Sequence, residues 1–133
     1  MSVSMISQGD TFWAKDFAEG VDSHLLIVIS DPVKNPDELV LVTLTTWERD
    51  KDDSCYLMPG DHPFIKHDTC VQYNGFARTV SVMQLERVIA QGELVPREPV
   101  SARVLQKILE GAGDTRFLTN HQLRILDEQE LID

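Results

Sequence analysis

The amino-acid sequence predicts a mainly β fold of the α+β class, a small β-barrel followed by C-terminal helices. Short runs rich in β-branched residues alternate with turn residues through the first two-thirds of the chain. Two amphipathic segments with helical spacing follow toward the C-terminus. The length of 133 residues is that of one domain, with enough chain for one hydrophobic core.

The expected strands are runs in which apolar and β-branched residues follow one another between turn residues. The run HLLIVIS, which begins at His24, is nearly continuous in apolar residues and is typical of a buried strand. Pro32 and Pro36 punctuate the loop after it, and Pro59-Gly60 marks a later turn. The segments expected to form strands are 11–17, 24–30, 38–46, 54–58 and 69–73.

The pattern changes after residue 75, where we expect the strand to continue into Val82 and a short helical turn to follow. The clearest helix is EPVSARVLQKILEGAG, residues 98–113, in which Pro99 suits the first turn and the closing glycines end the helix. Its apolar positions fall on one face at helical spacing, and they are Val100, Val104, Leu105, Ile108 and Leu109.

A last helix is expected in TNHQLRILDEQELID. Thr119 is followed three residues later by Gln122, which is the pattern of a capping box. The end of the chain is also acidic, and we expect it to cover a groove or to pack on a partner chain.

The charge and the cysteine content narrow the class of protein. The net charge of −10 repels phosphate backbones and argues against general nucleic-acid affinity, although residues 54–109 are nearly balanced and leave room for a local basic patch. The chain contains two cysteines and its first residues lack the features of a secretory signal, so we expect a reducing cytoplasm. No run of about 18 apolar residues occurs, so no membrane span is expected.

The stretch CYLMPGDHPFIKHDTCVQY holds both cysteines and two of the four histidines of the chain. Cys55, His62, His67 and Cys70 are residue types that zinc accepts, but their spacing matches no zinc motif. If the segments around the two cysteines pair as antiparallel strands, the cysteines become small core residues. We favour this interpretation, two strands joined by a turn, over a metal site or a disulfide.

Candidate functional residues occur at the end of one expected strand and in the loop after the next. LTTWERD places the hydroxyls of Thr45 and Thr46 at a strand end, next to Trp47 and Arg49. An aromatic ring at such a position is able to stack on an unpaired base, although Trp47 could equally be a packing residue. His62 and His67, in the loop that follows Pro59-Gly60, are each either a general base or a structural, turn-capping residue.

The order of these segments resembles the MazF/PemK toxin family, small cytoplasmic endoribonucleases of bacterial toxin–antitoxin modules with an SH3-like barrel. The resemblance extends from Gly9 to about Ala112. It therefore implies a barrel domain with its terminal helix, residues 1–112, and an added acidic helical C-terminal extension, residues 113–133. GDTFWAKDF is similar to the opening strand of the family, HLLIVISDP to the next strand, LVLVTLTT to the strand that ends in Thr or Ser, and HDTCVQYNGFARTV to a later strand and its turn. The helix around Val100–Leu109 resembles the terminal helix of the family.

The resemblance implies metal-independent cleavage of single-stranded RNA, with no cofactor. The hydroxyl tied to catalysis in the family corresponds to Thr45, with Thr46 adjacent, and the catalytic Arg of the family corresponds to His24, a departure from the pattern. His24 is able to exchange protons near neutral pH but does not supply permanent charge. The missing charge is then expected from Arg49 or Arg78.

In this reading Trp47, Arg49, Arg78 and His62 bind the substrate. The resemblance also implies a homodimer and an antitoxin-like protein partner. Two alternatives stay open. The chain is either a catalytically inactive barrel that serves as a protein-binding or regulatory module, or a toxin of the CcdB type, which shares the barrel but acts on DNA gyrase by protein contact.

Overall fold

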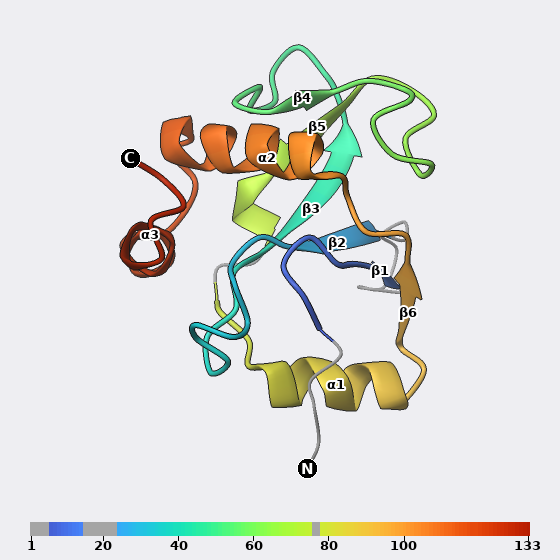
Figure 1. Cartoon of the computed structure of the whole chain (residues 1–133). Coiled ribbons are helices and arrows are strands. Elements are labelled where there is room, and N and C mark those ends of the chain that lie inside the picture. Colours follow the sequence, from blue (N-terminus) through green and yellow to red (C-terminus); the bar gives the residue numbers. More distant parts are fainter. Residues whose placement is uncertain (1–5, 15–23, 76–77) are drawn as a thin grey trace.

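The computed structural model describes residues 6–14, 24–75 and 78–133, and these form a small α+β protein. Six strands make one antiparallel sheet, and three α-helices pack around it (Figure 1). The strands are β1 (Thr11–Ala14), β2 (His24–Val28), β3 (Leu41–Thr46), β4 (Tyr56–Leu57), β5 (Thr69–Gln72) and β6 (Leu94–Arg97). The helices are the 3-10 turn η1 (Tyr73–Gly75), α1 (Val82–Ala90), α2 (Ala102–Asp114) and α3 (Asn120–Glu128).

The sheet has the strand order β4-β5-β3-β2-β1-β6. Among the described residues β4 and β6 form its two edges, and no pairing between these edges closes the sheet. The predicted α+β class with C-terminal helices is therefore confirmed, whereas closure into a barrel is not, and the described residues are not mainly β, because the three α-helices hold more residues than the six strands.

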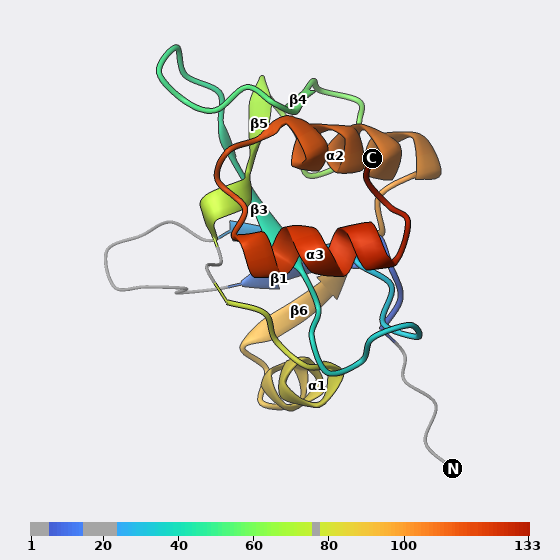
Figure 2. The same cartoon turned by 90° about the vertical axis from the view of Figure 1, so that its left-hand side faces the viewer.

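The central strands are buried on both faces, which explains the nearly continuous apolar run of β2. Leu25 and Ile27 belong to a core shared with α2 and α3, and Leu26 and Val28 belong to a second core shared with α1. Alternate residues of a strand point to opposite faces, so each core receives every second residue. Figures 1 and 2 show the result, with α2 and α3 on one side of the sheet and α1 on the other.

Strand β6 and helix α1 were not predicted as they occur. No strand was predicted at residues 94–97, where β6 forms the edge of the sheet and contains Pro96; proline is tolerated on an edge strand because its missing N–H is not needed for the ladder. Of the strand expected to continue into Val82, residues 78–81 show only an isolated bridge of Val80 to Leu39, and the rest lies outside the described residues. The short helical turn expected after it is a nine-residue helix that begins at Val82. Ser81 begins it with a complete capping box in which Gln84 is the second partner, a signal that the sequence contained.

The C-terminal helices follow the predicted apolar pattern, with different ends. α2 begins after the cap Ser101 and continues through Gly111 and Gly113 to Asp114, so the glycines do not end it. α3 begins at the predicted capping box of Thr119 and Gln122. Side-chain packing outweighed the helix-breaking tendency of the two glycines.

Residues 113–133 pack on the chain's own core. The proposed segment boundary after residue 112 falls inside α2, and Leu118, Ile125 and Leu126 are buried with the strands. The side chain of Gln129 accepts a hydrogen bond from the backbone N–H of Asp31 at 2.8 Å. Within the described ranges no helix has the length and apolar composition needed to cross a membrane.

Candidate functional site

A cavity of about 260 Å³ lies at the rim of the sheet, where β2 begins, β3 ends and β5 begins. We call it the rim cavity. It combines two histidines, a lysine and several hydroxyl groups, and its lining residues are His24, Leu44, Thr45, Thr46, Phe64, Lys66, His67 and Thr69. His24, Thr45 and Thr46, which were selected from the sequence, therefore line one cavity with His67, one of the two possible general bases, and the structure adds Lys66.

The register of the sheet explains why His24 and Thr45 meet. β2 and β3 are antiparallel neighbours with Leu26 opposite Thr43. Continuing this register by two residues on each strand brings His24 opposite Thr45, on the same face of the sheet. The pairing could not be obtained from the spacing of the two residues along the chain.

The hydroxyl of Thr45 is held by a lysine that the sequence analysis did not select. Lys51 Nζ lies 2.8 Å from Thr45 Oγ1 and 2.9 Å from the carbonyl oxygen of Thr46. It also lies 4.0 Å from the carboxylate of Glu48. Lys51 thus carries a positive charge to the end of β3, although in the sequence it is hidden in the acidic run that follows Trp47.

The loop between β4 and β5 supplies Phe64, Lys66 and His67, and Asp61 fastens this loop to α2. The Asp61 carboxylate lies 2.6 Å from Arg103 and 3.8 Å from Lys107, and it accepts the backbone N–H of Met58 at 2.9 Å. Burial alone would raise the pKa of Asp61, but these hydrogen bonds and charges outweigh it and hold the pKa below 3.8.

His62 fastens the same loop at a second point. Its ring is buried, Nε2 lies 2.5 Å from the carbonyl oxygen of Glu98, and Nδ1 accepts the backbone N–H of Phe64 at 3.0 Å. Both ring nitrogens are therefore engaged with the backbone, which leaves neither for a substrate. His62 is a positioning residue for the rim cavity, and we do not retain it among the substrate-binding candidates.

The other candidates from the sequence lie outside the rim cavity. Trp47 is 40% exposed, and its ring makes a T-shaped contact with the ring of Tyr56, with centroids 6.0 Å apart. Arg49 is exposed in the loop after Trp47. Arg78 is also exposed. It lies two residues before Val80, whose backbone pairs with Leu39. Leu39 precedes the start of β3, whereas Thr45 lies near the end of that strand.

The two cysteines are small core residues, as the strand interpretation predicted. β4 and β5 pair antiparallel, and both thiols are buried and form no disulfide. Burial raises the pKa of Cys55 to about 11 and also raises the pKa of Cys70, which disfavours the thiolate that would bind a metal. In the part of the chain that the structure describes, no three His, Cys, Asp or Glu side chains are grouped to hold a metal ion.

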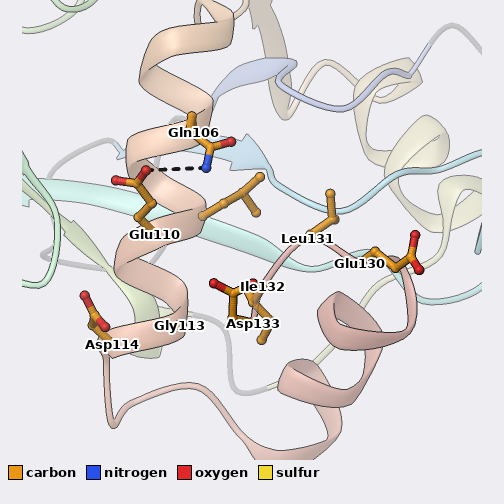
Figure 3. Close-up of a pocket in the computed structure, with 9 residues that line it drawn as sticks. Gln106, Glu110, Gly113, Asp114, Glu130, Leu131, Ile132 and Asp133 are labelled. Carbon is orange, nitrogen blue, oxygen red and sulfur yellow. Dashed lines mark hydrogen bonds between the residues drawn. The ribbon is translucent and has the colours of Figure 1, made fainter.

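A cavity of about 620 Å³, larger than the rim cavity, lies between α2 and the C-terminal segment (Figure 3). Its carboxylates come from Glu110, Asp114, Glu130 and Asp133, and Gln106 donates to Glu110 at 3.4 Å. No lysine, arginine or histidine lines it among the described residues. Such a cavity repels phosphate groups, so we place the candidate site at the rim cavity instead.

Comparisons with protein-family models, with curated proteins and with solved structures gave no match. Fold and site together define a small α+β protein whose sheet has, at one end, a cavity lined by two histidines and a lysine.

Proposed function

We propose that this chain is a MazF/PemK-like toxin of a toxin–antitoxin module, a metal-independent endoribonuclease that cleaves single-stranded RNA in the rim cavity. One observation carries the proposal. His24 and Thr45, chosen from two separate motifs, line the same cavity together with a second histidine, His67. RNA cleavage by attack of the 2′-hydroxyl needs one group to accept a proton and one to donate a proton, and two imidazoles meet that need.

In the proposed reaction the 2′-oxygen of RNA forms a bond to the adjacent phosphorus, and the bond from phosphorus to the 5′-oxygen breaks. His24, opposite Thr45, accepts the proton of the 2′-hydroxyl. Protonated His67 donates a proton to the departing 5′-oxygen. The products are a 2′,3′-cyclic phosphate and a 5′-hydroxyl, and neither an oxidant nor a metal ion takes part.

Positive charge for the phosphoryl oxygens comes from two lysines in place of the family's arginine. Lys66 lines the rim cavity, and Lys51 is in contact with Thr45 Oγ1. Positive charge placed beside the phosphoryl oxygens stabilises the negative charge that develops on them in the transition state. Trp47, Arg49 and Arg78 then contact more distant parts of the RNA.

The proposal includes the remaining properties that the resemblance implies. The proposal keeps the SH3-like barrel that the resemblance implies, and the six-stranded sheet of the described residues is the part of the fold that supports it. The protein acts in the cytoplasm as a homodimer, and an antitoxin-like protein controls it. Sedimentation of the purified chain at several concentrations tests the dimer, and a monomer at all of them would remove this part.

A second candidate is a binding or regulatory module without catalysis. It is favoured by the acidic residues around Lys51, among them Glu48 at 4.0 Å, which weaken the positive field that phosphate requires. It is also favoured by His24 in place of a permanently charged arginine.

Incubation of the purified chain with single-stranded RNA and a chelator separates the two candidates. We expect cleavage that falls by at least about 100-fold in His24→Ala and Thr45→Ala, while Thr45→Ser keeps a hydroxyl and part of the activity. His121→Ala is the matched histidine control, because His121 is exposed at the start of α3, contacts Glu38 and does not line the rim cavity, so this variant should cleave like the parent chain. RNA that stays intact at high protein concentration would leave the binding module as the better description.

A further inference from the structure

Lys51 lies in the loop between β3 and β4, residues 47–55, which has no regular secondary structure. With Asp52 it lines a cavity of about 270 Å³ that shares Thr45 with the rim cavity. Residues 47–50 are exposed, so core packing does not fix the first half of the loop. Nevertheless, the amine of Lys51 is held 2.8 Å from Thr45 Oγ1. Because a lysine side chain loses rotamer freedom when it is held in one position, such a contact is favoured where the backbone beside it is already fixed.

Asp52, the next residue, fixes the loop at this point. One oxygen of its carboxylate accepts hydrogen bonds from the backbone N–H and the hydroxyl of Ser54, at 3.0 and 2.6 Å. The other oxygen accepts a hydrogen bond from the hydroxyl of Thr115 at 2.6 Å, across 63 residues of sequence. Burial alone would raise the pKa of this carboxylate, but hydrogen bonds from Ser54 and Thr115 and the charge of Arg116 outweigh it and hold the pKa below 3.8. The acceptor is therefore ionised at neutral pH, which makes these hydrogen bonds stronger than neutral ones.

Thr115 is itself held firmly by its surroundings. It is buried at the C-terminal end of α2, where its backbone N–H donates to the carbonyl oxygen of Gly111 at 2.8 Å. Its hydroxyl also accepts the backbone N–H of Phe117 at 3.2 Å. Leu118, three residues after Thr115, is buried in the core with α2 and α3. The loop is thus attached, one residue after Lys51, to a well-packed part of the chain.

We propose that the hydrogen bond between Asp52 and Thr115 positions Lys51 at Thr45, so that residues 113–133 help to form the rim of the sheet. Asp52 and Thr115 are then positioning residues, which act through Lys51. The consequence for RNA cleavage rests on the proposed function, in which Lys51 stabilises negative charge on the phosphoryl oxygens.

Proton exchange between the Lys51 ammonium and water, followed by NMR, tests the positioning without RNA. Lys51 donates to Thr45 Oγ1 and to the carbonyl oxygen of Thr46, so it should exchange more slowly than the exposed Lys34. Thr115→Val removes the hydroxyl at nearly constant side-chain size. It should speed the exchange of Lys51 at least about fivefold, the equilibrium effect of one lost hydrogen bond. Lys34 is the internal reference in the same sample and should not change.

Two threonine variants are the controls. Thr115→Ser keeps the hydroxyl and should exchange like the parent chain. Thr79→Val makes the same change as Thr115→Val at a threonine whose hydroxyl has no hydrogen-bond partner among the described residues, and it should also leave Lys51 unchanged.

Asp52→Ala breaks the same hydrogen bond from the side of the loop and leaves the bond between Thr115 and Phe117 in place. Because Asp52 is only partly buried in a loop, the core stays intact, and this variant decides the question if Thr115→Val does not fold. The double variant should exchange no faster than Asp52→Ala alone, since both changes remove one interaction. Unchanged exchange at Lys51 in the single variants, or additive effects in the double variant, would overturn the inference.

Cleavage kinetics test the consequence for the reaction. Thr115→Val should lower kcat by roughly tenfold and leave KM within about twofold, because the charge of Lys51 acts on the transition state. Thr115→Ser should restore the parent kcat. A raised KM with an unchanged kcat would overturn the positioning of Lys51 at the reacting phosphate. A parent chain that does not cleave RNA would refute the nuclease and leave the exchange measurement to decide the positioning, whereas cleavage with unchanged exchange in Thr115→Val would refute the positioning alone.

Discussion

Two regions of the same sheet differ in how they use their side chains. Toward α2, Tyr73 is buried and its hydroxyl donates to the carbonyl oxygen of Ile108 at 2.7 Å. At the rim, Thr45 is only partly buried, and its hydroxyl contacts the charged amine of Lys51. The helix-facing region is closed by packing, whereas the rim keeps polar groups beside two cavities.

Strand β3 contributes side chains both to the core and to the rim. In β3, Val42 and Leu44 belong to the core under α2 and α3, and Thr43 and Thr45 point to the other face. The core residues fix the position of the strand, and its last residues lie at the rim. We therefore expect substitutions under α2 to change stability and substitutions at the rim to change function.

The largest effect on stability is expected for Gly111→Ala. A Cβ atom at Gly111 would lie 2.3 Å from the hydroxyl of Tyr73 and 2.8 Å from both the Cβ of Cys55 and the carbonyl oxygen of Ser54. Helix α2 would have to move away from β4, at a cost of about 2 kcal/mol or more in the free energy of unfolding. Chemical denaturation measures this cost.

Gly113→Ala is the matched control, one half-turn further along the same helix. Its Cβ atom would meet nothing closer than the Cβ of Ile132 at 4.0 Å, so alanine should be neutral or should stabilise by about 0.5–1 kcal/mol. Equal destabilisation by both substitutions would show that close packing under α2 is not what separates the two regions.

An intermediate effect is expected for Asp61→Asn, because Asp61 ties the rim loop to α2. The pKa of Asp61 is depressed in the folded state, so its charge stabilises the fold above pH 3.8, and this contribution is lost as the pH falls through the folded-state pKa. Asp61→Asn should therefore cost about 1 kcal/mol at neutral pH and nothing at a pH below the folded-state pKa.

Thermal unfolding of both chains, measured from neutral pH to a pH below the folded-state pKa of Asp61, gives the difference in their stability. A difference in stability that stays constant from neutral to acidic pH would mean that the charge of Asp61 does not hold the loop.

The smallest effect on stability is expected at the rim itself. His67 is exposed, so His67→Gln should change the free energy of unfolding by less than about 0.5 kcal/mol. RNA cleavage should nevertheless fall by about 100-fold, because the proposed proton donor is lost. Full cleavage by His67→Gln would assign proton donation to another group, and strong destabilisation would place His67 with the structural residues.

Part of the candidate site was accessible from the sequence. His24, Thr45 and Thr46 were selected from motifs at strand ends, and all three line the rim cavity. Lys51 and Lys66 were missed as site residues because they lie in loops, where the sequence pattern does not specify which way a side chain points. His62 was selected for its residue type, and its burial and its bond to Glu98 depend on contacts 36 residues apart.

The sequence by itself determined the local elements, because their signals are local. The apolar run of β2, the facing apolar positions of α2 and the capping box at Thr119 each depend on residues within one element. Tertiary structure decided what those signals do not contain. It made Pro96 part of an edge strand, carried α2 past its glycines, and brought His24 opposite Thr45 through the register of two strands. The physical reason is that helix caps and apolar periodicity act within a few residues, whereas register and cavities arise from packing between distant segments.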